Sequence, residues 1–385
     1  MKKQIKNLLK RNTVGLRFLD AYALLQLGSF IKVNPLSKNF PKVIQLPITN
    51  RCNSRCEMCN VWNMDTSGEY SSDEFKEILN DNLFDEVISV GINGGEPTLV
   101  SDLDAYANHI LNLPKLKYLN IISHGFNTER ALRVFKKIYL LCRNKNVKFH
   151  ISISLDGVGL IHDKVRQIPG GFEKTISTIE NILTDQSLYC DTFDVACTVV
   201  KSNINYLIEL ESYCEDKNIP IKYRLGISNK RIESDLLTEA YDVTLDQDTK
   251  ISVIEFFHGQ TIKAKSLTAK FKYFSIFSWL TMDEKTRFLG CDWKNEGATL
   301  DSKGNLYYCA VNSEKLGNLR ENSGSDIFFS DENLQHRKSI VENSCNNCIH
   351  DYGGKTHFQN LIAFSRFILS NRFSIKIYRI RSFFL

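Results

Sequence analysis

Three cysteines lie close together early in the chain. The stretch NRCNSRCEMCNVW, residues 50–62, places Cys52, Cys56 and Cys59 in a C-x3-C-x2-C pattern. A structural metal site usually has four protein ligands, and a disulfide joins two cysteines. Three thiolates leave one coordination position open, which a catalytic metal centre requires and a structural one avoids. The pattern therefore predicts a reactive iron–sulfur centre, with zinc completed by a distant His or Cys as the alternative.

Four further cysteines form a second group. Cys291 and Cys309 flank the segment GATLDSKGNLYY, which has the turn residues of a hairpin, and Cys345 and Cys348 follow as a C-x2-C pair. Small domains with little apolar core often need a metal for stability. Ligand type alone fits a four-cysteine zinc site and a four-cysteine iron–sulfur site equally well.

The segments between these groups alternate between strand-type and helix-type patterns. Short Val/Ile/Leu-rich runs are followed by stretches with helical spacing of apolar residues, which predicts parallel strands joined by right-handed crossovers. Six such units fall short of the eight of a closed barrel, so an α/β fold with a partial (β/α)6 barrel of TIM type is expected. Its active-site groups should lie at the C-terminal strand ends, where the three-cysteine loop falls. The predicted strands are 43–49, 86–92, 116–123, 147–157, 193–200 and 220–227, and the predicted helices are 71–81, 102–113, 128–144, 172–185 and 205–218.

This arrangement of a C-x3-C-x2-C loop after the first strand resembles the radical S-adenosylmethionine superfamily over about residues 43–228. The resemblance implies that Cys52, Cys56 and Cys59 bind a [4Fe–4S] cluster whose open iron chelates S-adenosylmethionine. Reductive cleavage then yields a 5′-deoxyadenosyl radical that abstracts hydrogen from the substrate. The residue before the third cysteine is usually aromatic in the family and is Met58 here. A thioether can still pack against adenine.

Further cofactor contacts follow from the same resemblance. The run NGGEP, residues 93–97, matches the family's GGEP motif, which implies that Gly94, Gly95 and Glu96 lie at the amino group of S-adenosylmethionine. Ser154, in SISLDG, is expected near the ribose, and Arg166 near the methionine carboxylate. The alternative is a half-buried serine and a surface arginine.

The second cysteine group resembles the SPASM/twitch extension of the same superfamily. The full SPASM form has seven cysteines, and this segment has four, so a shorter, twitch-like form is implied. Cys291, Cys309, Cys345 and Cys348 would then hold one auxiliary [4Fe–4S] cluster that transfers electrons, with zinc as the alternative. Cys197, inside a predicted strand, is a candidate hydrogen-atom donor if its thiol faces the cavity; otherwise it packs as a small hydrophobe.

The substrate is less well indicated by the sequence. Only 42 residues precede the first strand, which disfavours a peptide-recognition domain and favours oxidation or epimerisation of a sugar, cyclitol or other small polar molecule. The alternative is a maturase or epimerase that modifies a ribosomally made peptide. A different class, a non-catalytic iron–sulfur electron carrier or sensor, has no use for an open iron. We expect a reducing partner such as flavodoxin or ferredoxin, and no nucleic acid.

The two ends of the chain are basic and rich in aromatic residues. Residues 1–19 hold six Lys and Arg and residues 356–385 hold five, with no acidic residue in either, although the net charge is only +5. This predicts peripheral contact with an anionic membrane surface, or alternatively packing on the protein body. Clustered cysteines without a signal peptide indicate a reducing, cytoplasmic location. The predicted domains are a basic helical extension (1–42), a core (43–230), a helical connection (231–284), a twitch-like domain (285–355) and a basic aromatic tail (356–385).

Overall fold

The computed structural model describes the backbone of residues 13–30, 33–233 and 237–381, with side chains except at 13, 14, 238, 240 and 372–381. The chain divides into two compact units. The larger unit combines residues 34–249 with 293–344, and the smaller one combines residues 1–33, 250–292 and 345–385.

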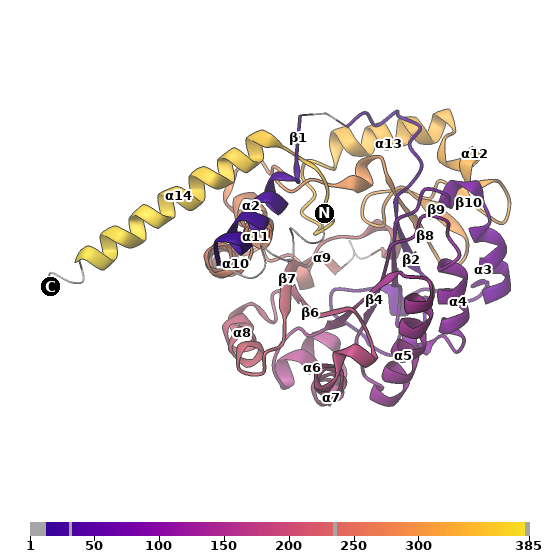
Figure 1. Ribbon diagram of the computed structural model, residues 1–385, viewed down its shortest axis with the longest axis horizontal. Helices are drawn as coiled ribbons and strands as arrows, with labels where there is room; N and C mark the ends of the chain where they lie inside the picture. The colour runs from indigo at the N-terminus through magenta and orange to yellow at the C-terminus, as the bar shows by residue number, and fades with distance from the viewer. Residues whose placement is uncertain (1–12, 31–32, 234–236, 382–385) are drawn as a thin grey trace. The chain divides into compact units, whose positions relative to one another are not determined.

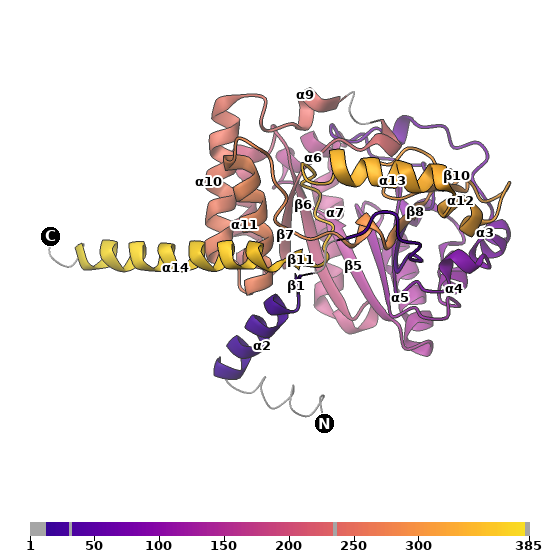
Figure 2. The same cartoon turned by 90° about the horizontal axis from the view of Figure 1, so that it is seen from above.

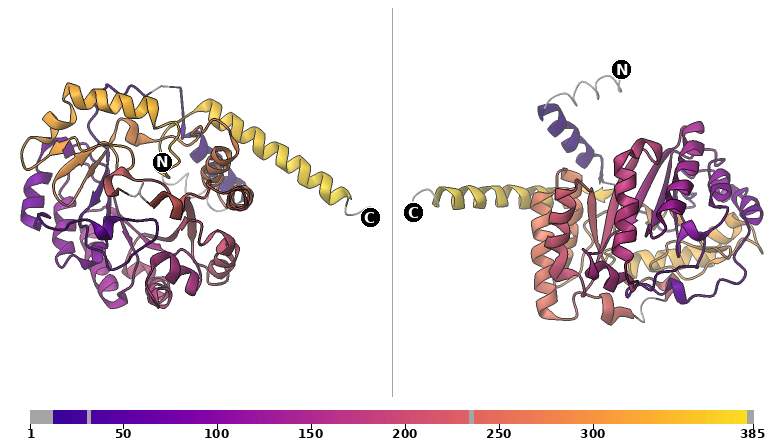
Figure 3. Two further views of the ribbon diagram at one scale, coloured as in Figure 1. Left: turned by 180° about the vertical axis from the view of Figure 1, so that it is seen from behind. Right: turned by 90° about the horizontal axis from the view of Figure 1, so that it is seen from below.

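The larger unit is built on a curved sheet in which six neighbouring strands, the last of them at one edge, are parallel and pair in chain order. This confirms the α/β fold and all six predicted β units. Helices lie on the outer side of the curve, as Figure 1 and the left view of Figure 3 show. The strands are β2 (Val43–Pro47), β3 (Ser89–Asn93), β4 (Tyr118–Ser123), β5 (Lys148–Ser154), β6 (Thr192–Val199) and β7 (Ile221–Leu225). The helices are α3 (Ser72–Leu79), α4 (Leu103–Ile110), α5 (Thr128–Asn144), α6 (Leu160–Arg166), α7 (Gly171–Thr184) and α8 (Leu207–Asp216).

Some helices begin where a side chain satisfies one of their first backbone N–H groups. At α3, the Ser71 hydroxyl accepts from the Glu74 N–H, and the Glu74 carboxylate accepts from the Ser71 N–H at 2.9 Å, which completes a capping box. Asn127 caps α5 in a similar way through the Arg130 N–H. The faces turned to the sheet are apolar, as with Phe75 on α3, which is fully buried.

The predicted hairpin around DSKGN forms and extends the same sheet. Strand β8 (Gly297–Leu300) pairs in parallel with β2, and β9 (Asn305–Tyr307) and β10 (Gly317–Asn318) follow antiparallel. Gly304 turns the hairpin at φ +85°, and the Asp301 carboxylate accepts from the backbone N–H groups of Lys303 and Asn305. The segment predicted as one small domain, 285–355, contributes residues to both compact units, and its assignment as a domain stays a prediction. Helices α12 (Gly324–Phe328) and α13 (Asp331–Asn343) follow β10, as Figure 2 shows.

The smaller unit is mainly helical. Helices α10 (Gln247–Lys263) and α11 (Leu267–Thr281) form most of the helical connection predicted at 231–284, after a short α9 (Thr238–Tyr241) in the larger unit. Helices α2 (Thr13–Leu25) and α14 (Phe358–Arg381) flank the parallel pair of β1 (Gly28–Ser29) and β11 (Thr356–His357), as labelled in Figure 2. A core of Leu24, Phe271, Phe274, Leu361 and Phe364 joins α2, α11 and α14. Within the described part of the chain, no helix is long and apolar enough to cross a membrane.

Short 3-10 turns lie between several of these helices and strands in the described part of the chain. They lie at Val61–Asn63, Asn82–Phe84, Pro97–Leu99, Gln186–Leu188, Ile204–Tyr206, Lys230–Ile232 and Asp292–Lys294.

Candidate iron–sulfur and cofactor site

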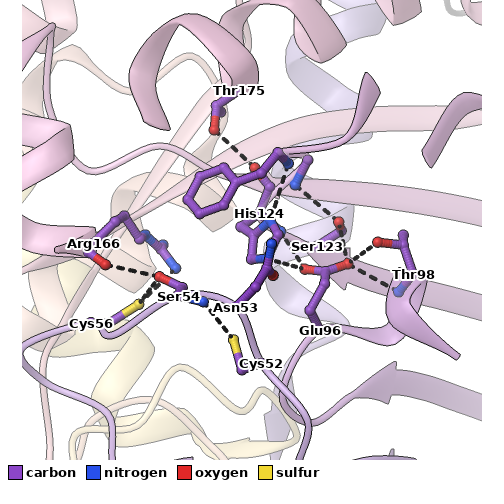
Figure 4. Close-up of polar contacts among 12 residues, drawn as sticks. Cys52, Asn53, Ser54, Cys56, Glu96, Thr98, Ser123, His124, Arg166 and Thr175 are labelled. Carbon is purple, nitrogen blue, oxygen red and sulfur yellow. Dashed lines mark hydrogen bonds and ion pairs between the residues drawn. The ribbon is translucent and has the colours of Figure 1, made fainter. Parts of the chain in front are cut away.

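The three-cysteine loop follows β2, at the C-terminal edge of the parallel sheet (Figure 4). Cys56 is buried, and Cys52 and Cys59 are partly exposed. The C-terminal ends of the neighbouring strands supply the other groups around it: Glu96 after β3, and Ser123 and His124 at the end of β4. This is the edge at which the sequence places the active-site groups.

The cysteine loop and the Gly94–Glu96 turn are bonded directly through their backbones. The Gly95 N–H donates to the Thr49 carbonyl at 2.6 Å, and the Glu96 N–H donates to the Arg51 carbonyl at 2.8 Å. A Cβ atom at Gly94, where φ is +129°, would lie 2.4 Å from the Thr49 oxygen, and one at Gly95 would lie 2.1 Å from the Arg51 oxygen. Both glycines are therefore required for the turn to lie against the cysteine loop. The sequence predicted a close approach to a ligand, and the close approach seen here is to the loop.

Glu96 is almost completely buried, and both of its carboxylate oxygens have donors. Oε1 accepts from the Thr98 N–H and hydroxyl, at 3.0 and 2.7 Å, and from the Ser123 hydroxyl at 2.7 Å. Oε2 accepts from the His124 N–H at 2.9 Å and lies 3.3 Å from His124 Nε2. A carboxylate oxygen has two lone pairs, so Oε1 is saturated and Oε2 is the oxygen with capacity for a further donor.

His124 links Glu96 to the cysteine loop, and it was not among the residues predicted from the sequence. Its Nδ1 accepts from the Phe126 N–H at 3.1 Å, so the ring proton of the neutral imidazole lies on Nε2. That Nε2–H donates to Asn53 Oδ1 at 2.8 Å, between two of the cysteines. Burial lowers the pKa of His124, which keeps the imidazole neutral at neutral pH. The available sequence signal was a histidine directly after a parallel strand, in SHGFN.

Two polar groups lie at the Cys56 sulfur. Arg166 Nη1 donates to the sulfur at 3.4 Å, and the Ser54 hydroxyl lies 3.1 Å from it while donating to the Arg166 carbonyl at 3.0 Å. The rest of the Arg166 guanidinium binds the fully buried Asp156 carboxylate through Nε and Nη2, each 2.6 Å from Oδ2. Arg166 is therefore not a surface arginine; it ends α6 beside a predicted cluster ligand, and its predicted contact with a methionine carboxylate stays a prediction.

The other predicted site residues lie on the same unit. Ser154 is buried at the end of β5, and Met58 packs against the small cluster of Val165, Val200 and Tyr241. Cys197 is fully buried in β6. It lies on the same face of the strand as Val195 and Val199, which are also fully buried. Burial raises the pKa of its thiol well above the usual range. Cys197 therefore behaves as a small hydrophobe in this structure, and its role as a hydrogen donor stays a prediction.

One arginine organises the segment that holds most of the second cysteine group. The buried Arg287 guanidinium donates to the carbonyls of Leu289, Cys348 and His350 at 2.7–2.9 Å, and also to that of Tyr352. Its own N–H donates to the Asn346 carbonyl at 2.8 Å. Cys291, Cys345 and Cys348 lie in this smaller unit, and Cys309, whose sulfur accepts from the Asn312 N–H at 3.4 Å, lies in the larger one. Their four-ligand site stays a prediction.

The chemistry around the first cysteine group fits an iron–sulfur cluster. Hydrogen bonds to sulfur are typical of cluster ligands; Cys52 accepts one from the Ser54 N–H at 3.5 Å, and Cys56 accepts one from Arg166. Burial raises the pKa of Cys52 to about 12 and that of Cys59 to about 11. These thiols therefore need bound positive charge to ionise, which iron supplies. Among the described residues, no three His, Cys, Asp or Glu side chains form a group that could hold a single metal ion.

Two family models match the chain. Residues 46–184 match the radical SAM superfamily, and residues 291–349 match SPASM, an iron–sulfur cluster-binding domain. Among curated relatives, an Fe-coproporphyrin III synthase of Methanosarcina barkeri is 23% identical, with 81% of each chain covered. A cysteine-type anaerobic sulfatase-maturating enzyme of Clostridium novyi is 21% identical, over 78% of this chain and 83% of the relative. A pre-heme d1 synthase of Dinoroseobacter shibae is 26% identical, but the match spans only 43% of its length.

Solved structures share the fold. The enzyme anSMEcpe with bound AdoMet and Cp18Cys peptide superposes with a TM-score of 0.55 at 15% identity, covering 87% of this chain and 99% of that one. Streptococcus suis SuiB bound to precursor peptide SuiA superposes with a TM-score of 0.54 at 17% identity, covering 77% of this chain and 66% of that one. The radical SAM domain implies a [4Fe–4S] cluster and S-adenosylmethionine as cofactors, and the SPASM domain implies auxiliary iron–sulfur binding. The chain therefore contains a radical SAM domain over residues 46–184 and a SPASM iron–sulfur cluster-binding domain over residues 291–349.

Proposed function

We propose that this radical SAM enzyme modifies a peptide or a protein segment by hydrogen abstraction. A sugar or cyclitol substrate, the main expectation from the sequence, has less support. The relatives include a sulfatase-maturating enzyme and the sporulation killing factor maturation protein SkfB of Bacillus subtilis, the latter 24% identical over 58% of this chain. Three of the structures that share the fold contain a bound peptide.

The observation that carries the catalytic part is the direct bonding of the cysteine loop to the Gly94–Glu96 turn. In this arrangement Cys52, Cys56 and Cys59 hold the cluster, and Glu96 Oε2 accepts from the amino group of the cofactor beside it. When bound, the cluster and S-adenosylmethionine supply an electron and a 5′-deoxyadenosyl radical.

The remaining residues hold this arrangement in place. His124 donates from Nε2 to Asn53 of the cysteine loop, and its backbone N–H donates to Glu96 Oε2. Arg166, fixed by Asp156, places a cation at the Cys56 sulfur, where a thiolate needs stabilisation. Cys291, Cys309, Cys345 and Cys348 are proposed to bind the auxiliary cluster, which passes electrons to or from the substrate site.

The catalytic part is tested by anaerobic reconstitution followed by dithionite and S-adenosylmethionine. We expect 5′-deoxyadenosine by liquid chromatography, and none from a Cys52→Ala variant. If the reconstituted enzyme forms none, the chain is an electron carrier or sensor and the catalytic proposal fails.

The substrate class is tested by deuterium transfer. The enzyme is incubated with deuterated peptides encoded beside its gene, with coproporphyrin, and with a cyclitol, and 5′-deoxyadenosine is analysed by mass spectrometry. We expect deuterium only from a peptide, together with a mass change in that peptide. Transfer from coproporphyrin or the cyclitol alone would overturn the peptide assignment and leave the catalytic part intact.

A further inference from the structure

Helix α2 carries a second apolar stripe opposite the face that packs. Leu24 lies in the core with Phe271 and Phe274, and on the same side the Asp20 carboxylate accepts from the Leu267 N–H at 2.8–2.9 Å. Phe18, Tyr22 and Leu25 are spaced i, i+4 and i+7 and form one stripe on the other face, with 61%, 54% and 56% exposure. A surface helix normally presents polar residues there.

Helix α14 repeats this arrangement. Leu361 and Phe364 are buried in the same core, whereas Ile362 and Leu369 are more than half exposed. The exposed Arg366 lies between these two at the same helical spacing.

The two helices belong to one unit, and the end of α2 and the start of α14 lie at the same pair of strands. The parallel pairing of Gly28 with Thr356 and of Ser29 with His357 joins the end of α2 to the start of α14. Phe30, 76% exposed, packs beside Phe358 with ring centroids 4.4 Å apart. Figure 2 labels the two helices leaving this strand pair, and the right view of Figure 3 shows them in indigo and yellow.

The positive charge of the two terminal segments indicates an anionic partner. Residues 1–19 and 356–385 contain eleven Lys and Arg and no acidic residue. In the described part of α2 the acid is Asp20, which is already bonded to α11. A second copy of the chain would bring like charges together. Nucleic acid would use the basic and aromatic residues, but the exposed Leu16, Leu25, Ile362 and Leu369 offer nothing on which bases could stack.

We propose that α2 and α14 form a docking surface for the interfacial region of an anionic lipid bilayer. The apolar stripes enter the boundary between headgroups and acyl chains, and the basic residues contact lipid phosphates. This places the enzyme on a membrane surface, and it does not depend on the identity of the substrate.

The test is sedimentation of the reconstituted full chain with vesicles of phosphatidylcholine, with and without phosphatidylglycerol. We expect binding to the anionic vesicles, reduced at least about tenfold by the triple variant Phe18→Ser, Tyr22→Ser, Leu25→Ser. The matched control replaces three exposed apolar residues of the larger unit, Leu140, Leu188 and Ile208, by serine, and it should bind as the unchanged chain does.

A second pair of variants tests the charge component. Arg17→Gln and Arg366→Gln should each weaken binding to anionic vesicles about fivefold and leave circular dichroism and iron content unchanged. The proposal would be overturned if the chain bound neutral and anionic vesicles equally, or if the control triple variant lost as much binding as the α2 triple variant. Self-association of the chain without vesicle binding would also overturn it. So would retention by single-stranded DNA that vesicles do not compete away.

Discussion

The two cysteine groups of this chain are held in different ways. The loop of Cys52, Cys56 and Cys59 is fixed by many bonds from several elements: backbone bonds to the Gly94–Glu96 turn, to the end of α6, and the His124–Asn53 contact. The segment around Cys345 and Cys348 is bonded mostly by side chains that reach its backbone: Arg287 donates to a series of carbonyls, and the Trp279 indole donates to the Asn347 carbonyl. The first arrangement suits a site whose reacting groups must stay aligned, and the second suits a site that has only to hold its ligands.

The largest expected effect is the loss of catalysis when a ligand of the first loop is removed. Cys56→Ala removes a predicted cluster ligand, the sulfur that accepts from Arg166 and contacts the Ser54 hydroxyl, so formation of 5′-deoxyadenosine should fall by at least about 1,000-fold. Iron should fall from about eight to about four atoms per chain. Cys142→Ala, a buried cysteine of α5, is the control and should retain both.

Gly95→Ala should also reduce catalysis, without removing any ligand. Its Cβ would lie 2.1 Å from the Arg51 carbonyl oxygen, so the turn must separate from the cysteine loop. We expect about a 100-fold decrease in 5′-deoxyadenosine formation with a smaller loss of iron. Gly259→Ala, at a position with open space on α10, is the control. Normal activity in the Gly95 variant would show that the bonded turn is not needed.

Arg287→Met should affect the second group selectively. It removes the donors to the carbonyls of Cys348 and His350, so about half of the iron should be lost while the first cluster keeps its electron paramagnetic resonance signal. Arg337→Met, at another buried arginine bonded to backbone carbonyls, should destabilise the chain but retain the iron. Equal losses in the two variants would remove the contrast between the two groups.

The smallest effect expected is a pH dependence from His162. This fully buried histidine accepts from the Asp156 N–H through Nδ1, and burial lowers its pKa from 6.5 to about 3. The unfolded chain therefore takes up a proton below pH 6.5 that the folded chain does not. The free energy of unfolding should fall by up to about 1.4 kcal/mol per pH unit as the pH drops from about 6.

His162→Asn, which keeps an acceptor for the Asp156 N–H, should flatten this slope in denaturant titrations between pH 7 and 5. A variant with an unchanged slope would show that another group titrates in this range.

The fold was predictable from the sequence because the strands are local signals. The six parallel strands are short Val/Ile/Leu runs, and caps such as Ser71 and Asn127 mark the helix starts. The pairing of β8 with β2 was not predictable, because nothing local to Gly297–Leu300 indicates which edge it will join.

The site was predictable where a motif has fixed spacing, and less so where distant residues meet. The cysteine loop and the GGEP run were each visible in the sequence, but the bonds between them depend on the adjacency of β2 and β3. His124 and Arg287 were not predicted, because single buried polar residues have no sequence pattern of their own. The partners that define their roles, Asn53 for His124 and Cys348 for Arg287, are far away in the sequence.

The parallel pairing of β2 with β8 has a consequence for synthesis of the chain. The bond from Lys42 to Glu296 spans 254 residues, so at 5–20 residues per second the outer edge of β2 has no partner for roughly ten to fifty seconds after it leaves the ribosome. An unpaired strand edge is a template for aggregation. During that interval the nascent chain has its greatest need of a chaperone. A chain truncated before residue 297 would leave the outer edge of β2 unpaired permanently.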